Sequence, residues 1–125
     1  MDKQLQPIVQ TLEKEFGAEV DEFRGDVQIL LAPDQLVAAG LKLRDEFDFA
    51  LLSTITATDY WPEESPRFHV VYLFNSLSKN LQLMVRVPVA GEKPTVPTLT
   101  EVYKNSNWRE RELWDMFGIH VDGHP

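Results

Sequence analysis

The chain has 125 residues, a net charge of -8 at pH 7 and an isoelectric point of about 4.8. This length suits a single domain with a core of its own. So acidic a chain is not drawn to nucleic acid or anionic lipid by its overall field. The absence of cysteine excludes disulfides, thiolate metal sites and cysteine nucleophiles. No stretch approaches the ~20 apolar residues of a membrane span, and the first residues lack the features of a signal peptide. We therefore expect a soluble protein that touches a membrane only through partners.

The first predicted element is a helix over residues 5–16. Its apolar residues recur at helical spacing and form one stripe, and Gly17 is placed to end the helix in a left-handed conformation. Pro7 fits the first turn, where its missing N–H does no harm. The stripe consists of Leu5, Ile8, Val9, Leu12 and Phe16.

Two short strands and a second helix follow. Residues 18–23 and 27–31 are predicted to form an antiparallel hairpin around Arg24-Gly25-Asp26, with the first strand near a sheet edge. Pro33 and Asp34 then open a helix. Gly40 weakens this helix, and we expect it to allow a close approach to the sheet. The predicted buried stripe of the helix is Leu36, Val37, Leu41 and Leu43.

Three longer segments alternate with period two and are rich in β-branched and aromatic residues, which predicts strands over residues 49–57, 68–74 and 81–87. A surface loop is expected at residues 60–66 and a hairpin loop at 76–80. The fold class predicted is α+β. We expect two layers, with a mixed, largely antiparallel sheet of about five strands, helices mainly on one face, and a further C-terminal helix.

The rest of the chain divides in two. A proline-rich connection, residues 89–106, is expected to be extended and irregular with no core of its own. It separates a sheet domain, residues 1–88, from a C-terminal docking helix and tail, residues 107–125. We expect all three segments to belong to a single domain.

The C-terminal helix carries the strongest signal. Asn107 followed three residues later by Glu110 has the form of a capping box, and Gly118 is placed to end the helix. Arg111 and Asp115 lie four residues apart and can pair. A helix of about ten residues is too short to be stable alone, so something must hold it.

The apolar residues of this helix exceed what one narrow stripe requires. They are Trp108, Leu113, Trp114, Met116 and Phe117. Large aromatic side chains interleaved with arginine are typical of the centres of protein interfaces. The simpler interpretation is that the helix only covers one face of the sheet, with its charges in water. Both can hold together, one face packing on the sheet and the other on a partner.

A family resemblance rests on the run from Glu110 to Ile119, which reads ERELWDMFGI and is followed by Gly123-His124-Pro125. This pattern resembles the signature of the 30 kDa (C-type) subunit of respiratory complex I. Similar segments of that family occur upstream, at Asp59-Tyr60, 68–72, 85–88 and 96–100, and before Asn107-Trp108. The resemblance covers most of the chain.

The resemblance implies a function for the whole assembly rather than for this chain. Such subunits belong to the peripheral arm of NADH:quinone oxidoreductase, a proton-translocating complex on the cytoplasmic face of the inner (plasma) membrane. They hold no cofactor, metal or catalytic centre, and they brace the neighbouring D-type (49 kDa) subunit, which helps to shape the quinone site. Together with the two tryptophans, the residues that match the signature make up the predicted partner interface. These residues are Trp108, Glu110, Arg111, Glu112, Trp114, Asp115, Phe117, Gly118, Gly123, His124 and Pro125.

One departure from the family pattern concerns the end of the chain. A basic segment containing arginine normally follows the Gly-His-Pro of this family, whereas this sequence stops at Pro125. The expectation is either a truncated chain or a short version with less of the segment that grips the partner.

Other functions stay open at this stage. A similar subunit of a membrane-bound nickel–iron hydrogenase or formate hydrogenlyase would carry the same signature. A free-standing small-molecule binding domain would require a deep pocket lined by strand residues, and an acid–base enzyme would require clustered carboxylates in a cleft. A metal site at His120 and His124 would need a further ligand such as Asp122 or Asp115.

Overall fold

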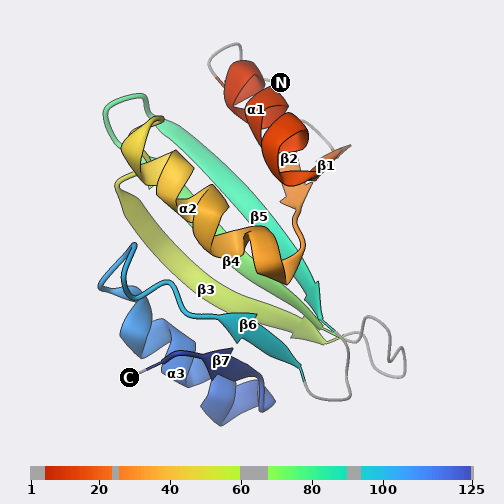
Figure 1. The fold of residues 1–125 in the computed structure, drawn as a ribbon, viewed down its shortest axis with the longest axis vertical. Coiled ribbons are helices and arrows are strands. Elements are labelled where there is room, and N and C mark those ends of the chain that lie inside the picture. Colours follow the sequence, from red (N-terminus) through yellow and green to blue (C-terminus); the bar gives the residue numbers. More distant parts are fainter. Residues whose placement is uncertain (1–4, 24–25, 60–67, 90–93, 125) are drawn as a thin grey trace.

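The structure, a computed structural model, describes residues 5–23, 26–59, 68–89 and 94–124, with side chains left out of the description for 21–23 and 26. It consists of two layers, a five-stranded sheet and a layer of helices and connecting segments (Figure 1). The predicted loop at 60–66 and the Arg24-Gly25 part of the predicted turn lie outside the described residues.

The sheet has the strand order β1-β2-β5-β4-β3. Its strands are β1 Glu19–Phe23, β2 Asp26–Leu30, β3 Leu51–Asp59, β4 Phe68–Ser76 and β5 Leu81–Val89. All neighbouring pairs are antiparallel except β2 with β5, which is parallel. The predicted mixed, largely antiparallel sheet is therefore confirmed, with the first strand of the hairpin at an edge.

The helices are α1 Leu5–Phe16, α2 Leu36–Asp45 and α3 Ser106–Phe117, with a short 3-10 turn, η1 Pro33–Gln35, before α2. Figure 1 shows α1 and α2 lying across one face of the sheet and α3 beside β3. On that covered face every second residue of β4 is buried, as the period of a strand requires. α1 ends at Gly17, whose φ of 67° confirms the predicted left-handed residue.

The buried stripe of α2 differs from the prediction. It consists of Leu36, Ala39, Gly40 and Leu43, whereas Leu41 is 39% exposed. The choice of Leu41 was wrong because steps of three, one and three residues from Leu36 keep one helical face inward, and position 41 lies off that face. Gly40 allows a close approach of the connection rather than of the sheet. A Cβ there would lie 3.6 Å from a methyl carbon of Leu99 and 3.7 Å from one of Val102.

The proline-rich connection is more regular than predicted. It contains strand β6, Thr95–Pro97, which pairs in parallel with β7, His120–Asp122, from the C-terminal tail. Its apolar side chains enter the shared hydrophobic core, among them Val96, Leu99, Val102 and Tyr103. The expectation of an irregular segment was wrong because the strand partner of β6 lies more than twenty residues further along the chain, where a local pattern does not reveal it.

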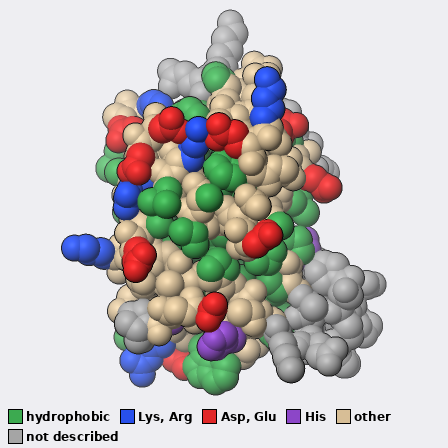
Figure 2. Space-filling model, viewed as in Figure 1, with side chains coloured by type: hydrophobic (Ala, Val, Ile, Leu, Met, Phe, Trp, Pro, Cys, Tyr) green, Lys and Arg blue, Asp and Glu red, His purple; other side chains and the backbone are tan. Residues whose placement is uncertain are grey.

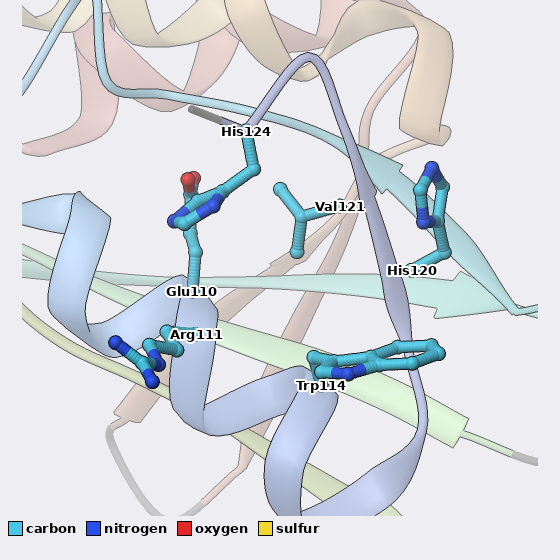
Figure 3. A pocket seen from close by; sticks show the side chains of 6 residues that line it. All are labelled: Glu110, Arg111, Trp114, His120, Val121 and His124. Atoms are coloured by element: carbon cyan, nitrogen blue, oxygen red, sulfur yellow. The ribbon is translucent and has the colours of Figure 1, made fainter.

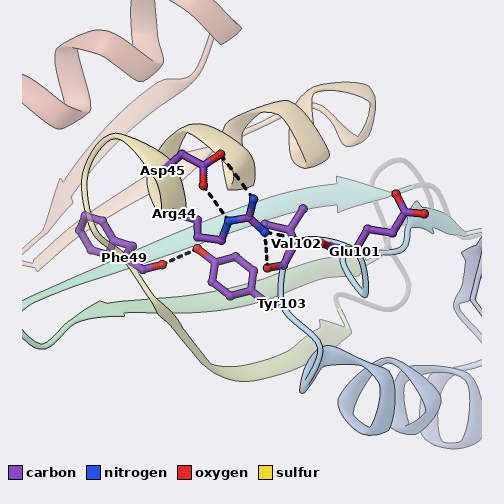
Figure 4. A network of polar contacts seen from close by, with 6 residues as sticks. All are labelled: Arg44, Asp45, Phe49, Glu101, Val102 and Tyr103. Atoms are coloured by element: carbon purple, nitrogen blue, oxygen red, sulfur yellow. Dashed lines mark hydrogen bonds and ion pairs between the residues drawn. The ribbon is translucent and has the colours of Figure 1, made fainter.

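Polar contacts fasten the connection to the rest of the fold (Figure 4). The Arg44 guanidinium at the end of α2 donates to the carbonyl of Val102 at 2.9 Å and pairs with Asp45. The hydroxyl of Tyr103 donates to the carbonyl of Phe49 at 2.6 Å. Asn105 Nδ2 donates to the carbonyl of Leu52, on β3, at 2.8 Å. The chain therefore enters α3 from a fixed position.

The role of the connection in the core gives a first prediction. Leu99 is fully buried, so Leu99→Ala is expected to lower the free energy of unfolding by about 2–5 kcal/mol. Leu77, which is 80% exposed, provides the control, and Leu77→Ala is expected to change stability by less than about 0.5 kcal/mol. Urea unfolding followed by circular dichroism measures both. Equal, small effects would mean that the connection contributes little to the core.

Candidate functional site

The centre of the C-terminal region is the carboxylate of Glu110, which is completely buried. Its Oε1 accepts a hydrogen bond from the Thr98 hydroxyl at 2.7 Å, and its Oε2 accepts one from the backbone N–H of Leu99 at 2.7 Å. Both donors belong to the connection. One side chain of α3 therefore fixes the helix to the segment that follows β6.

The predicted capping box is wrong. α3 begins at Ser106, and its N-cap is Asn105, which makes no side-chain capping bond. The backbone N–H of Asn107 donates to the carbonyl of Lys104, and the carboxylate of Glu110 accepts from Thr98 and Leu99 instead. The spacing of Asn107 and Glu110 fits a capping box, but in the folded chain Glu110 forms tertiary hydrogen bonds with Thr98 and Leu99.

Burial raises the pKa of the Glu110 carboxyl above its ordinary value of 4.5, against the opposing effect of the hydrogen bonds from Thr98 and Leu99 and of nearby His124. Tyr72, on the covered face of β4, is also fully buried, and burial together with the charge of Glu110 raises its pKa well above the usual range. Burial therefore penalises the ionised form of Glu110, and the two short hydrogen bonds partly offset this cost.

A cavity of about 240 Å³ opens next to Glu110 (Figure 3). Glu110, Arg111 and Trp114 line it from α3, and His120, Val121 and His124 line it from β7 and the tail. Figure 3 shows the His124 ring beside the Glu110 carboxylate and the Trp114 ring reaching from α3 toward β7. The tail thus forms one wall and the helix the other.

A second depression of about 320 Å³ lies toward the start of α3. Lys104, Asn105, Asn107, Trp108 and Arg111 line it. Arg111 is the residue that the two cavities share. Its ion pair with Asp115 has an Nε–Oδ2 distance of 3.9 Å, and both side chains are largely exposed. The predicted pairing is confirmed, but such a pair contributes little.

The apolar residues of α3 divide between two faces. Leu113 is buried, and the Phe117 ring packs edge-on against Phe68, with the centroids 6.3 Å apart. Three large apolar side chains instead face outward, with Trp108 67% exposed, Trp114 59% and Met116 73%. Lone exposed apolar residues are common, but two tryptophans and a methionine on twelve residues are not explained by packing on the sheet.

The tail is held in place by backbone geometry. Gly118 has φ 69° and ends α3, which confirms the predicted stop, and Gly123 has φ 83°. A Cβ on Gly123 would lie 3.2 Å from the Thr98 methyl carbon, so this turn favours glycine on two counts. His124 Nε2 donates to the carbonyl of Asn107 at 2.9 Å, which returns the tail to the start of α3.

The structure brings together some of the predicted interface residues and separates others. Glu110, Arg111, Trp114 and His124 meet at one cavity, and Trp108 lies at the next. The remainder lie elsewhere: Glu112 and Asp115 are exposed on α3, Phe117 packs on the sheet, Gly118 and Gly123 shape the backbone, and Pro125 falls outside the described residues.

Sequence reasoning missed the partners of Glu110 and the residues that complete the cavities, namely Thr98, Leu99, His120, Val121, Lys104 and Asn105. The only signal was that residues 96–100 belong to a segment with family resemblance. Nothing in the sequence of that segment indicates that the Thr98 hydroxyl and the Leu99 amide donate hydrogen bonds to the carboxylate of Glu110.

Comparisons with known proteins agree with this arrangement. The family model described as respiratory-chain NADH dehydrogenase, 30 kDa subunit, matches residues 29–125. The chain belongs to this family. The C-type subunit of the NADH-quinone oxidoreductase of Roseiflexus castenholzii is 40% identical over 106 residues, which are 83% of this chain and 60% of that protein. The C-type subunit of Trichlorobacter lovleyi is 36% identical over 120 residues, which are 94% of this chain and 74% of that protein.

Members of the family extend beyond the compared region. The chain spans 47% of the matching C-type subunit of Salinispora tropica and 62% of the second C-type subunit of Rhizobium meliloti. It therefore represents about half to three-fifths of the length of several curated relatives.

Two solved structures share the fold. The Nqo5 trypsin-resistant fragment (1-134) superposes with a TM-score of 0.83 at 29% identity, covering 98% of both chains. A chain of the membrane-bound sulfane sulfur reductase, an archaeal respiratory membrane complex, superposes with a TM-score of 0.82 at 27% identity, covering 99% of this chain and 73% of that one. The family fold thus occurs in more than one respiratory assembly.

Two further properties of the described residues bear on function. None of the helices is long and apolar enough to cross a membrane. Within the same residues no group of three or more histidine or acidic side chains is arranged to hold a metal ion. His120 and His124 line one cavity, but neither Asp122 nor Asp115 joins them there.

Burial of Glu110 gives a pH-dependent prediction. Its pKa is raised on folding, so the folded chain binds this proton more strongly than the unfolded chain. The resulting stabilisation is complete below the unfolded value of about 4.5 and is lost as the pH rises through the folded-state pKa. Glu110→Gln cannot titrate. The free energy of unfolding of the wild type minus that of E110Q is therefore expected to be greatest at acid pH and to fall as the pH rises.

Urea unfolding at a series of pH values measures this difference. Glu112→Gln removes the same charge from an exposed position of α3 and separates burial from net charge. A difference between wild type and E110Q that is constant with pH would contradict the assignment of a raised pKa to Glu110.

Proposed function

We propose that the protein is a non-catalytic structural subunit of the peripheral arm of a complex I-type NADH:quinone oxidoreductase. In this role it braces the D-type (49 kDa) subunit near the quinone site during electron transfer from NADH to quinone. It would lie on the cytoplasmic face of the plasma membrane and reach the membrane only through the complex. The observation that carries the proposal is the outward face of α3, which has exposed tryptophans on a helix fixed from behind.

The physical argument concerns preorganisation. A binding face that is already ordered loses little conformational entropy when a partner arrives. Glu110, Leu113 and Phe117 hold α3 from the inside, so Trp108 and Trp114 are presented in fixed positions. Tryptophan and arginine dominate the energetically important centres of protein interfaces. The predicted interface residues that face inward, Glu110 and Phe117, would then support the interface without touching the partner.

The proposed role leaves two candidates for the parent complex, which differ in their electron donor. The structural likeness to a chain of an archaeal sulfane sulfur reductase supports the second candidate, an equivalent subunit of a related membrane-bound complex such as a hydrogenase or formate hydrogenlyase. Neighbouring genes distinguish the two. A flavin-containing NADH module would favour the first, and a hydrogenase large subunit with its metal ligands would favour the second.

A free-standing small-molecule binding domain is less well supported. The cavity beside Glu110 measures about 240 Å³ and is open to solvent at the junction of helix and tail. Sites that enclose drug-sized ligands are commonly about 300–1,000 Å³ and deeply concave. The lining of this cavity is shared between α3 and β7, whereas strand residues of the main sheet, Glu19, Leu30 and Pro88, line only a more open depression of about 350 Å³.

The proposal predicts direct association with the D-type subunit. Co-expression with a tagged D-type subunit of the same organism is expected to recover the wild-type chain. Combining Trp108→Ala and Trp114→Ala is expected to reduce recovery at least about tenfold, since buried tryptophan anchors contribute about 2 kcal/mol or more each. Leu77→Ala removes a more exposed apolar side chain from the β4–β5 turn and is the control. Full recovery of the double variant would contradict the proposed interface.

A further inference from the structure

The lining of the two cavities along α3 has a charge opposite to that of the chain as a whole. The chain carries -8, yet the charged and titratable side chains lining the two cavities are Lys104, Arg111, His120, His124 and Glu110. Figure 2 shows basic, acidic, histidine and hydrophobic side chains together at the end of the molecule where Figure 1 places α3 and the C-terminus. The cavities on the proposed partner surface are thus suited to an anion despite the acidic charge of the chain.

The one carboxylate in this lining does not cancel that preference. Glu110 is completely buried, and each of its oxygens already accepts a hydrogen bond from the connection. The His124 ring lies beside the carboxylate in Figure 3 and favours its charged form. A partner that approaches from solvent therefore meets Arg111, Lys104 and the imidazoles first.

Arg111 is the residue on which the two cavities converge. It lies three residues from Trp108 and three from Trp114, so the guanidinium stands between two exposed indole rings along one side of the helix. Its contact with Asp115 runs through Nε at 3.9 Å, longer than a hydrogen bond, so the Nη groups keep their fork of donors for another group.

These features fit a carboxylate better than other partner groups. The arginine fork binds a carboxylate with two parallel hydrogen bonds, and flanking aromatic rings exclude water from the pair and strengthen it. Glu112 and Asp115 project from the same helix but line neither cavity. Asp115 lies on the Arg111 side at 3.9 Å from Nε, so a partner carboxylate would bind at the Nη groups, away from Asp115.

We infer that the segment of the D-type subunit received by α3 is acidic, with an aspartate or glutamate side chain paired to Arg111 between Trp108 and Trp114. This inference rests on the proposed function and goes beyond it by specifying the chemistry of the partner. It also assigns separate roles to adjacent residues: Glu110 positions the helix, and Arg111 selects the partner group.

The helix itself offers a matched control. Arg109 is two residues from Arg111, so it projects from the opposite flank of α3, and it lines neither cavity. Arg111→Glu and Arg109→Glu change the net charge of the chain equally. Binding of each purified full-length variant to the purified D-type subunit is measured by calorimetry at about 50 and 200 mM salt, where screening of exposed charges differs. Urea unfolding verifies that each variant is folded.

Arg111→Glu is expected to weaken binding at least about tenfold and to reduce its salt dependence, because an attractive pair becomes repulsive. Arg109→Glu is expected to change binding less than about threefold, because half-buried Arg109 lies outside the proposed contact. A photocrosslinking amino acid at position 114, mapped by mass spectrometry, is expected to mark a stretch of the D-type subunit that contains Asp or Glu. Equal effects of the two arginine substitutions, or crosslinks only to stretches without a carboxylate, would overturn the inference.

The same experiment separates this inference from the proposed function. Loss of binding in the double tryptophan variant with unaltered binding of Arg111→Glu would keep α3 as the interface and reject an acidic occupant. A wild-type chain that does not bind the D-type subunit at all would reject both.

Discussion

The arrangement of the C-terminal third of the protein depends on a single buried carboxylate. Glu110 accepts hydrogen bonds from Thr98 and Leu99, and in doing so joins α3 to the connection that leads into it. A buried charge is costly unless it is well paired, so this contact defines one position of the helix rather than a range of positions. His124 adds a second tie by bonding to Asn107 at the start of the same helix.

Holding α3 from the inside has consequences for its outer surface. The side chains of α3 neither cap the helix nor all pack against the sheet. Glu110 turns inward, and Trp108, Trp114 and Met116 remain exposed. The helix is thereby stable in the absence of a partner and still retains apolar surface, the combination expected of a subunit that meets its neighbour with a preformed face.

The wider fold supplies the platform for this region. The connection is fastened by Arg44, Tyr103 and Asn105, and β6 pairs with β7 so that the tail returns alongside α3 (Figure 4). Family membership and the two structural relatives agree with the platform as a whole. One of these relatives belongs to a complex named for sulfane sulfur reduction.

The sequence by itself determined the sheet, its hairpin, the first helix and the glycine stops at 17 and 118, because periodic burial and left-handed glycines are local signals. It also determined the family, through the run from Glu110 to Pro125. Only the tertiary structure decided that β6 pairs with β7 and that Glu110 accepts hydrogen bonds from Thr98 and Leu99. Each of these depends on a partner far along the chain, and such contacts override local preferences when burial makes an unsatisfied polar group costly.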